Sequence, residues 1–279
     1  MKGLIELASY LFHLYSKGAS FFSRIYLPAP FNVLLLNLYA EKFGVNLDEA
    51  ELPLERYHSL YSFFTRRLKE GVRTFSPNPL IISSPCDGVI RDSGRIEGGM
   101  LLQAKRHRYT LSELIGGENA EEFENGVYIT HYLRPGDYHR FHYPVSGTVK
   151  KIIYYPGTIF PVNPSAEKKI PGLYALNERV VVIIESKYGK VALAIVGASA
   201  VGEIHINLLP SLVTNRLFGK RKLEFSLNER VRKGEELGFF GMGSTIISIA
   251  QNARVHRDIE EGMFVKTGSA IAVFNRSGE

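Results

Sequence analysis

The sequence has little cysteine, no long apolar run and no long basic block, and each of these absences excludes a class of protein. It has a single cysteine, Cys86, among 279 residues, so no internal disulfide can form and a reducing compartment is expected. It has no run of about 18 uncharged apolar residues, so no transmembrane helix is expected. Its basic residues fall in short groups and not in one long block, so nucleic acid is not expected as a partner.

The net charge indicates which kinds of binding partner the protein suits. The formal net charge is +6, with ordinary hydrophobic and charged contents of 45% and 22%. A basic protein suits nucleic acid, an anionic membrane surface or an acidic substrate. With no basic block to favour nucleic acid, the anionic membrane and the acidic substrate are the partners that we expect.

The N-terminus carries an apolar stretch over residues 4–15, which Glu6 and His13 interrupt. A signal peptide needs an unbroken apolar region, so these polar residues argue against one. The apolar residues recur at helical spacing, which fits a helix lying in a membrane interface. A helix packed on the protein core has the same periodicity, so the pattern leaves both interpretations open.

The chain changes texture after Pro77 and Pro79. Residues 1–70 have helical patterns, including an aromatic stripe over residues 54–68. From Ile81 onward, short β-branched and aromatic runs alternate with Gly, Pro and Asn, as in a barrel or sandwich of many strands. We expect a helix at residues 111–115 and strands that include residues 127–132, 149–155, 180–186, 191–196 and 246–249.

Two weak internal repeats refine the fold class. Residues 85–90 resemble residues 144–149, and residues 231–240 resemble residues 265–274, with a glycine at the same place in each copy. Such glycines suit tight turns between strands. We therefore predict an α+β protein with a mostly antiparallel β sandwich or barrel of the hybrid, biotinyl- and lipoyl-like type.

The first chemical candidate is the pair Gly243-Ser244, followed by Thr245. A Gly-Ser-Thr tripeptide is commonly an ordinary turn before a strand. Alternatively, the Ser244 hydroxyl attacks the preceding carbonyl, because glycine removes bulk and tolerates strained dihedrals. The amide then becomes an ester, and elimination followed by hydrolysis turns Ser244 into a pyruvoyl group and ammonia.

A serine needs a base, and residues 137–144 offer His139 and His142. Histidines three apart, with His131 nearby, also suit a metal site, although the chain has neither a cysteine cluster nor an HExxH pattern. A histidine that satisfies a core hydrogen bond is a further reading. Asp87, in an Asp-Gly turn, is the candidate carboxylate that would orient the base.

Together these motifs resemble the phosphatidylserine decarboxylase family over roughly residues 57–275. The one visible departure is Met242, where the bacterial family usually has leucine of similar volume. The resemblance rests on Arg73 and on residues 61–66, 84–88, 137–142, 156–163, 177–180, 196–198, 233–238 and 243–245.

The resemblance implies a proenzyme cut between Gly243 and Ser244 into chains 1–243 and 244–279, with Ser244 becoming the covalent pyruvoyl cofactor. Asp87 and His142 would complete a triad with Ser244, and His139 would lie near the substrate. The mature enzyme would decarboxylate phosphatidylserine to phosphatidylethanolamine through a Schiff base on the pyruvoyl group. His142 is our candidate proton donor, and no metal or external cofactor is implied.

The resemblance also suggests where the protein works. We expect residues 1–75 to form a helical, membrane-associating segment and residues 76–279 a β-rich catalytic domain. The enzyme would be peripheral on the cytoplasmic face of the bacterial cell membrane and would form a homo-oligomer, a dimer. Arg66, Arg67 and Arg73 are candidates for the membrane-facing surface, and each is equally compatible with ordinary solvated charge.

Three other functions fit parts of the sequence. A non-catalytic carrier or phosphotransfer domain of the hybrid type would explain the glycine repeats and leave the chain intact. A zinc-dependent hydrolase would use His131, His139 and His142. A pyruvoyl enzyme acting on a soluble amino acid would share the cleavage but not the membrane-directed N-terminus.

Overall fold

The protein is described by a computed structural model that covers residues 2–103, 107–199, 202–215, 221–241 and 244–276. It is an α+β fold with mostly antiparallel sheets, as predicted. The helices, with 3-10 turns marked η, are α1 (Lys2–Ser23), α2 (Ala29–Phe43), η1 (Leu47–Glu49), η2 (Leu54–Arg56), α3 (Leu60–Phe64), α4 (Leu111–Ile115), α5 (Gly117–Ala120), η3 (Glu121–Phe123), α6 (Pro164–Lys169) and α7 (Leu173–Leu176).

The strands begin at Ile81 and run nearly to the C-terminus. They are β1 (Ile81–Ser83), β2 (Gly88–Arg95), β3 (Met100–Gln103), β4 (His107–Thr110), β5 (Val127–Leu133), β6 (Arg140–His142), β7 (Gly147–Tyr155), β8 (Arg179–Glu185), β9 (Lys190–Gly197), β10 (Ile204–Ile206), β11 (Leu223–Val231), β12 (Glu236–Phe240), β13 (Ser244–Ala250), β14 (Ala253–Val255), β15 (Phe264–Val265) and β16 (Ala270–Phe274). The five predicted strands and the predicted helix at 111–115 are all confirmed.

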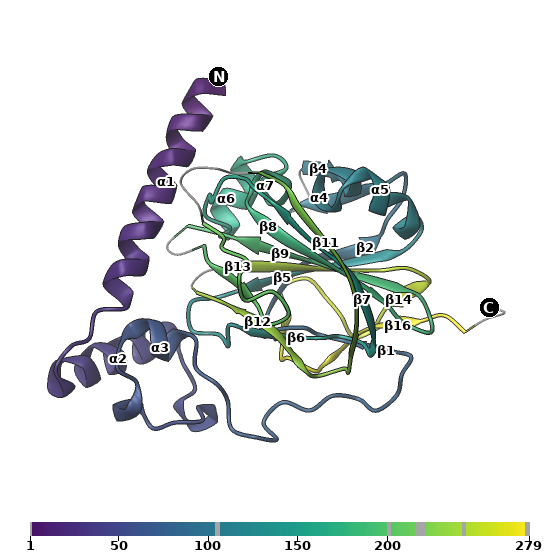
Figure 1. Cartoon of the computed structure of the whole chain (residues 1–279). Helices are drawn as coiled ribbons and strands as arrows, with labels where there is room; N and C mark the ends of the chain where they lie inside the picture. The colour runs from purple at the N-terminus through teal and green to yellow at the C-terminus, as the bar shows by residue number, and fades with distance from the viewer. Residues whose placement is uncertain (1, 104–106, 200–201, 216–220, 242–243, 277–279) are drawn as a thin grey trace.

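Helices α1, α2 and α3 lie along one side of the strands, and the chain leaves them to cross beneath the sheets (Figure 1). The prediction of one helical stretch over residues 54–68 is wrong in extent. Ser59 caps α3, because its Oγ accepts a hydrogen bond from the Ser62 amide at 3.2 Å. The helix ends at Phe64, and Leu68 instead forms a β-bridge with Ala50.

An eight-stranded sheet forms the centre, in the order β11-β7-β8-β9-β13-β5-β2-β15. Two three-stranded sheets, β1-β16-β14 and β10-β12-β6, and the hairpin β3-β4 complete the described strands. All pairings between these strands are antiparallel. Strand β13, which begins at Ser244, lies inside the large sheet between β5 and β9.

The central strands of the large sheet are buried on both faces. Side chains of β8 alternate between two hydrophobic cores, with Val180 and Val182 in one and Val181 and Ile183 in the other. The first core fills the space shared with the three-stranded sheets, and the second lies under helices such as α4 and α7. Burial on both faces explains why the sequence runs here are continuously apolar and do not alternate.

The two sequence repeats have matching backbone contacts. Gly234 and Gly268 both adopt left-handed dihedrals, with φ of 90° and 92°. The Gly234 amide donates to the Tyr143 carbonyl, and the Gly268 amide donates to the Ser84 carbonyl, both at 2.9 Å. The Gly234 turn is therefore bonded to the residue that precedes segment 144–149, and the Gly268 turn to the residue that precedes segment 85–90.

Among the described residues, no helix is both long enough and apolar enough to span a bilayer.

We predict that the Gly268 turn resists any side chain. An alanine Cβ there would come within 2.1 Å of the Thr74 carbonyl oxygen at a φ of 92°. Gly262 is the matched control, because its φ is 85° and its Cβ would meet nothing within 4 Å. Gly262→Ala should cost about 1 kcal/mol of unfolding free energy for the dihedral alone. Gly268→Ala should cost about 2 kcal/mol more for the clash, measured by urea denaturation, and equal losses would contradict this account.

Candidate active site

The start of β13 is the place where the predicted cleavage site falls. Gly243 lies outside the described residues, and only the backbone of Ser244 is described. Ser244 pairs with Leu133 at the end of β5 and with Gly197 at the end of β9. Just upstream, the Phe240 amide donates to the His139 carbonyl at 3.0 Å. The chain therefore approaches Ser244 alongside the segment that joins β5 to β6.

The segment joining β5 to β6 is fixed by its own polar groups. The Asp137 carboxylate accepts hydrogen bonds from the Arg134 amide at 2.7 Å and from Arg134 Nη2 at 2.9 Å. Arg66 is buried and its Nη2 donates to the Gly136 carbonyl at 2.8 Å. These bonds hold residues 134–137 in place and so fix the position of His139, which precedes β6.

His139 is fully buried against the ring of Phe64, with 4.0 Å between ring centroids. Its Nδ1 lies 2.9 Å from the Asp137 carbonyl and must donate, because a carbonyl oxygen only accepts. Nε2 then carries the lone pair, and it makes no hydrogen bond with any described residue. Burial lowers the pKa of His139 to about 3, so the ring is neutral at physiological pH.

His142 is half-buried on β6, and the same logic fixes its tautomer. Its Nδ1 donates to the Gly234 carbonyl at 2.9 Å, which leaves Nε2 as the basic atom. Nε2 lies 3.1 Å from the Tyr138 hydroxyl. Burial lowers the pKa of His142, while the bond to Gly234 and the charges of Glu236 and Asp87 oppose the shift. A neutral imidazole with an unprotonated nitrogen is what a general base requires.

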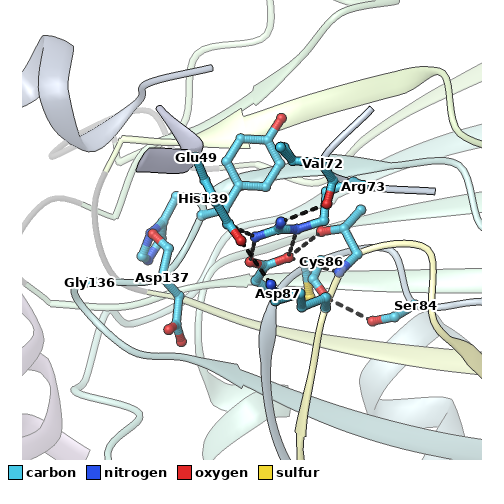
Figure 2. A network of polar contacts seen from close by, with 12 residues as sticks. Glu49, Val72, Arg73, Ser84, Cys86, Asp87, Gly136, Asp137 and His139 are labelled. Atoms are coloured by element: carbon cyan, nitrogen blue, oxygen red, sulfur yellow. Dashed lines mark hydrogen bonds and ion pairs between the residues drawn. The ribbon is translucent and has the colours of Figure 1, made fainter. Parts of the chain in front are cut away.

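Asp87 is buried at the start of β2, and its carboxylate is already fully bonded. Oδ1 accepts from the Thr267 amide and hydroxyl, both at 2.8 Å, and from Arg73 Nε at 2.9 Å. Oδ2 accepts from Arg73 Nη2 at 2.5 Å. Arg73 Nη2 also reaches Glu49 at 2.7 Å, so the guanidinium lies between two carboxylates (Figure 2).

The bond between Asp87 and the Thr267 amide has a counterpart elsewhere in the chain. In segment 144–149, which resembles segment 85–90, Ser146 stands at the position of Asp87, and its Oγ accepts from the Lys233 amide at 2.9 Å. Both side chains therefore cap the glycine turn of their own repeat. Asp87 differs from Ser146 because it has a second side-chain oxygen. Arg73 bonds to both carboxylate oxygens of Asp87.

The structure brings Asp87 and His142 into one neighbourhood without joining them. The His142 amide donates to the Pro85 carbonyl at 2.8 Å, so the two segments are adjacent. Yet no hydrogen bond links the two side chains among the described residues, because Asp87 is bonded to Arg73 and Thr267. The contacts that orient His142 are the Gly234 carbonyl and the Tyr138 hydroxyl.

The expectation that Arg66 and Arg73 face a membrane is wrong. The Arg66 residue is 4% exposed and the Arg73 side chain 9% exposed, and both are bonded within the fold. Arg67 alone of the three is exposed. A sequence gives the charge of an arginine but not its partner. The Arg73–Asp87–Glu49 network and the role of Tyr138 therefore gave no signal before the fold was known.

A metal site was the main alternative for the histidines. His131 is fully buried on β5, where its Nε2 lies 3.3 Å from Ser248 Oγ. Burial lowers the pKa of His131 to about 3. Within the described ranges, no three His, Cys, Asp or Glu side chains converge to hold a metal ion. What this part of the chain holds is a pair of imidazoles, His139 and His142, whose pKa values are both lowered by burial, a set suited to moving protons.

A family model and curated relatives both match this chain, and all of them concern phosphatidylserine decarboxylase. The family model for phosphatidylserine decarboxylase matches residues 60–273. A phosphatidylserine decarboxylase proenzyme of Anaeromyxobacter sp. (strain K) is 36% identical over 261 residues, which cover 92% of each chain. That of Vibrio parahaemolyticus is 36% identical over 248 residues, covering 86% of this chain and 87% of the relative. That of Coxiella burnetii (strain Dugway 5J108-111) is 39% identical over 219 residues, 76% of each chain.

We predict that Arg73 holds the buried carboxylate network together. Arg73→Leu would leave Asp87 with only its Thr267 donors and Glu49 with only Lys266. Losing one partner of a buried ion pair should lower the unfolding free energy by about 3 kcal/mol. The matched control is Arg232→Leu, because Arg232 is 88% exposed and only 4.0 Å from Glu235. That change should stay within about 0.5 kcal/mol, and similar losses in urea denaturation would refute the assignment.

Proposed function

Because this chain belongs to the phosphatidylserine decarboxylase family, we propose that it cuts itself between Gly243 and Ser244 and decarboxylates phosphatidylserine with the pyruvoyl group so formed. The product would be phosphatidylethanolamine, with release of CO2. Family membership makes the protein a decarboxylase, and not a carrier domain or a zinc hydrolase. The relatives are named proenzymes, which agrees with a cofactor made by cleavage.

One observation carries the proposal: His139 and His142, both with unprotonated Nε2 atoms, follow β5, whose last residue Leu133 pairs with Ser244 at the start of β13. His139 lies on the chain that hydrogen-bonds Phe240, just before the predicted cut. Its buried Nε2 has no hydrogen-bond partner among the described residues and carries a lone pair. It therefore suits a donor, such as the amine of the substrate, and not the carbonyl made from Ser244.

Self-cleavage balances with this chain's own groups and one water. The Ser244 oxygen would bond to the Gly243 carbonyl carbon while the C–N bond breaks, and His142 Nε2 would pass the hydroxyl proton to the amine. Loss of the Ser244 Cα proton would then expel the Gly243 carboxylate and leave a dehydroalanine. Its hydrolysis would consume water and release ammonia. Asp87 would act on this step through the ion network that surrounds the His142 segment.

In the decarboxylation, the pyruvoyl group would supply the electron sink for the carbanion left when CO2 departs. His142 is our proposed proton donor to that carbon, because the proton that Nε2 takes up can be returned from the same atom. His139 would line the substrate side of the site, where its buried neutral ring excludes water. Neither role needs a metal ion or an added cofactor.

We propose that residues 76–279 form a catalytic domain of the biotinyl- and lipoyl-like hybrid type. Matching turns at Gly234 and Gly268, fastened to Tyr143 and Ser84, support an internal duplication. Residues 1–75 would form the membrane-associating segment. The proposed dimer and the proposed place on the cytoplasmic face of the cell membrane rest on the family resemblance.

The surface of α1 supports membrane association. Small polar side chains of α1 face the protein, with Ser16 and Ser20 at most 4% exposed. The helix is fastened by Arg24 and Ser20 to Glu203. Large apolar side chains face outward, which reverses the usual arrangement of a surface helix. The most exposed apolar residues of α1 and α2 are Leu7, Leu11, Leu14, Tyr15, Phe21, Phe22, Phe31, Leu34 and Leu38.

Large apolar side chains exposed in this number on two helices mark an interaction site. A phospholipid substrate makes the bilayer its natural occupant, and a net charge of +6 favours an anionic leaflet. We propose that α1 and α2 lie in the interface and bring the start of β13 to the lipid headgroups.

We predict that the purified protein consists of two chains. Intact-mass spectrometry should find residues 1–243 and residues 244–279, and the smaller chain should carry a carbonyl that hydroxylamine modifies. Ser244→Ala should remain one inactive chain. Ser248→Ala is the matched control on the same strand, and it should still be cut because Ser248 faces His131. A processed Ser244→Ala chain would overturn the proposed cleavage.

We predict that Phe21 and Phe22 anchor the protein to lipid. They are 68% and 71% exposed, and burying one such side chain in an apolar medium is worth about 1.5–3 kcal/mol. Phe22→Ser should therefore weaken binding to phosphatidylserine-containing vesicles about tenfold or more in a flotation assay. Met263→Ser is the control, because Met263 is 42% exposed but precedes β15 in the catalytic domain. Equal effects of the two changes would count against the membrane assignment.

A further inference from the structure

Tyr138 is the one side chain that contacts the basic atom of His142 within the described part of the chain. Its hydroxyl lies 3.1 Å from Nε2. The two rings are stacked, with centroids 5.8 Å apart and an interplanar angle of 28°. Phe75 covers the imidazole from another direction at 5.9 Å. Tyr138 is itself only 6% exposed, so this arrangement is held by packing as well as by the hydrogen bond.

The direction of this hydrogen bond follows from the Gly234 contact. Nδ1 donates to the Gly234 carbonyl, so Nε2 of the neutral ring has a lone pair and no proton. The Tyr138 hydroxyl must therefore donate to it. Burial raises the pKa of Tyr138 well above its usual value, so the phenol keeps its proton and remains a donor.

Tyr138 also lies between two hollows of the molecule. It lines a cavity of about 150 Å3 together with Asp87, Asp137 and Arg73. It also lines a groove of about 490 Å3 that contains His142 and Lys233. Tyr138 therefore lies between the carboxylate network and the proposed base, with its hydroxyl at the nitrogen that a triad would give to the nucleophile.

We propose that Tyr138 is a positioning residue whose hydroxyl fixes the His142 ring and keeps Nε2 unprotonated until the Ser244 hydroxyl displaces it from the lone pair. This inference rests on the proposed role of His142. A donor on Nε2 can bond only to the neutral ring, so it stabilises that form over the imidazolium. The contact also stops the ring from turning about its Cβ bond, which preserves the aim of Nε2.

The test uses Tyr138→Phe, which removes the hydroxyl and keeps the stacked ring. Tyr143→Phe is the matched control, because Tyr143 is equally buried and its hydroxyl has no partner among the described residues. The His142 titration is followed by NMR of histidine-labelled protein in a Ser244→Ala background, which does not depend on cleavage or activity. The rate of cleavage is followed separately during cell-free synthesis of the chains that retain Ser244.

Removal of the hydroxyl should move the His142 titration upward by about half to one pH unit, since one hydrogen bond to the neutral ring is lost. Cleavage should become about tenfold slower because the ring loses its aim. Tyr143→Phe should change neither. Any difference in the titration midpoint of His142 isolates the effect of the hydroxyl, because the charged groups around His142 are the same in every variant. These groups are Asp87, Glu236, Arg140, Lys69, Glu70, Arg73, Arg232, Lys233 and Glu235.

Each result decides the matter. An unchanged titration midpoint in Tyr138→Phe overturns the proposal, even if cleavage slows, because slowing alone would be a structural effect. A normal cleavage rate overturns it as well, and so does an equal shift in Tyr143→Phe. If the parent chain is not cut at all, the proposed function fails, while the titration still reports on the contact between Tyr138 and His142.

Discussion

The carboxylate of Asp87 is the constraint on which the arrangement of this site depends. It is buried and bonded by Arg73, 14 residues away in the sequence, and by Thr267, 180 residues away. A buried charge is tolerated only when it is paired and hydrogen-bonded, so the segments that carry these partners must meet there. Through Arg73 the network extends to Glu49, and through Glu49 to Lys266. The helical segment, β2 and the turn before β16 are thereby fixed to one another at a single point.

The histidines obey a second constraint, which is imposed by the backbone. In both His139 and His142 a carbonyl oxygen takes the Nδ1 proton, so both rings present an unprotonated Nε2. Their surroundings then separate them. His139 lies in an apolar pocket against Phe64, whereas His142 is half-buried and stacked on Tyr138. Two identical side chains a few residues apart therefore lie in different surroundings, which suits the different roles proposed for them.

Much of this could be predicted from the sequence, for identifiable reasons. Continuous apolar runs such as residues 180–184 predict strands, because a sheet buried on both faces needs apolar side chains at every position. The glycine repeats predict the turns at Gly234 and Gly268, because few other residues adopt those dihedrals. The motifs around Asp87, His142 and Ser244 identify the family. In contrast, the partner of Asp87, the tautomers of the histidines and the buried places of Arg66 and Arg73 depend on contacts between distant segments, which no local pattern encodes. The period of α1 indicates an apolar face, but only the fold shows that Leu11 and Tyr15 are exposed while Phe12 packs against Phe160.

The central place of β13 has a consequence for the protein after maturation. A cut before Ser244 would release a short chain that begins in the middle of the large sheet, with β5 on one side and β9 on the other. The same short chain contains β16, which lies between β1 and β14, and β1 belongs to the long chain. The two products would thus remain interleaved through hydrogen-bonded neighbours in two sheets, without any disulfide. Their separation would require global unfolding, so the new N-terminus would stay in the place where it was made.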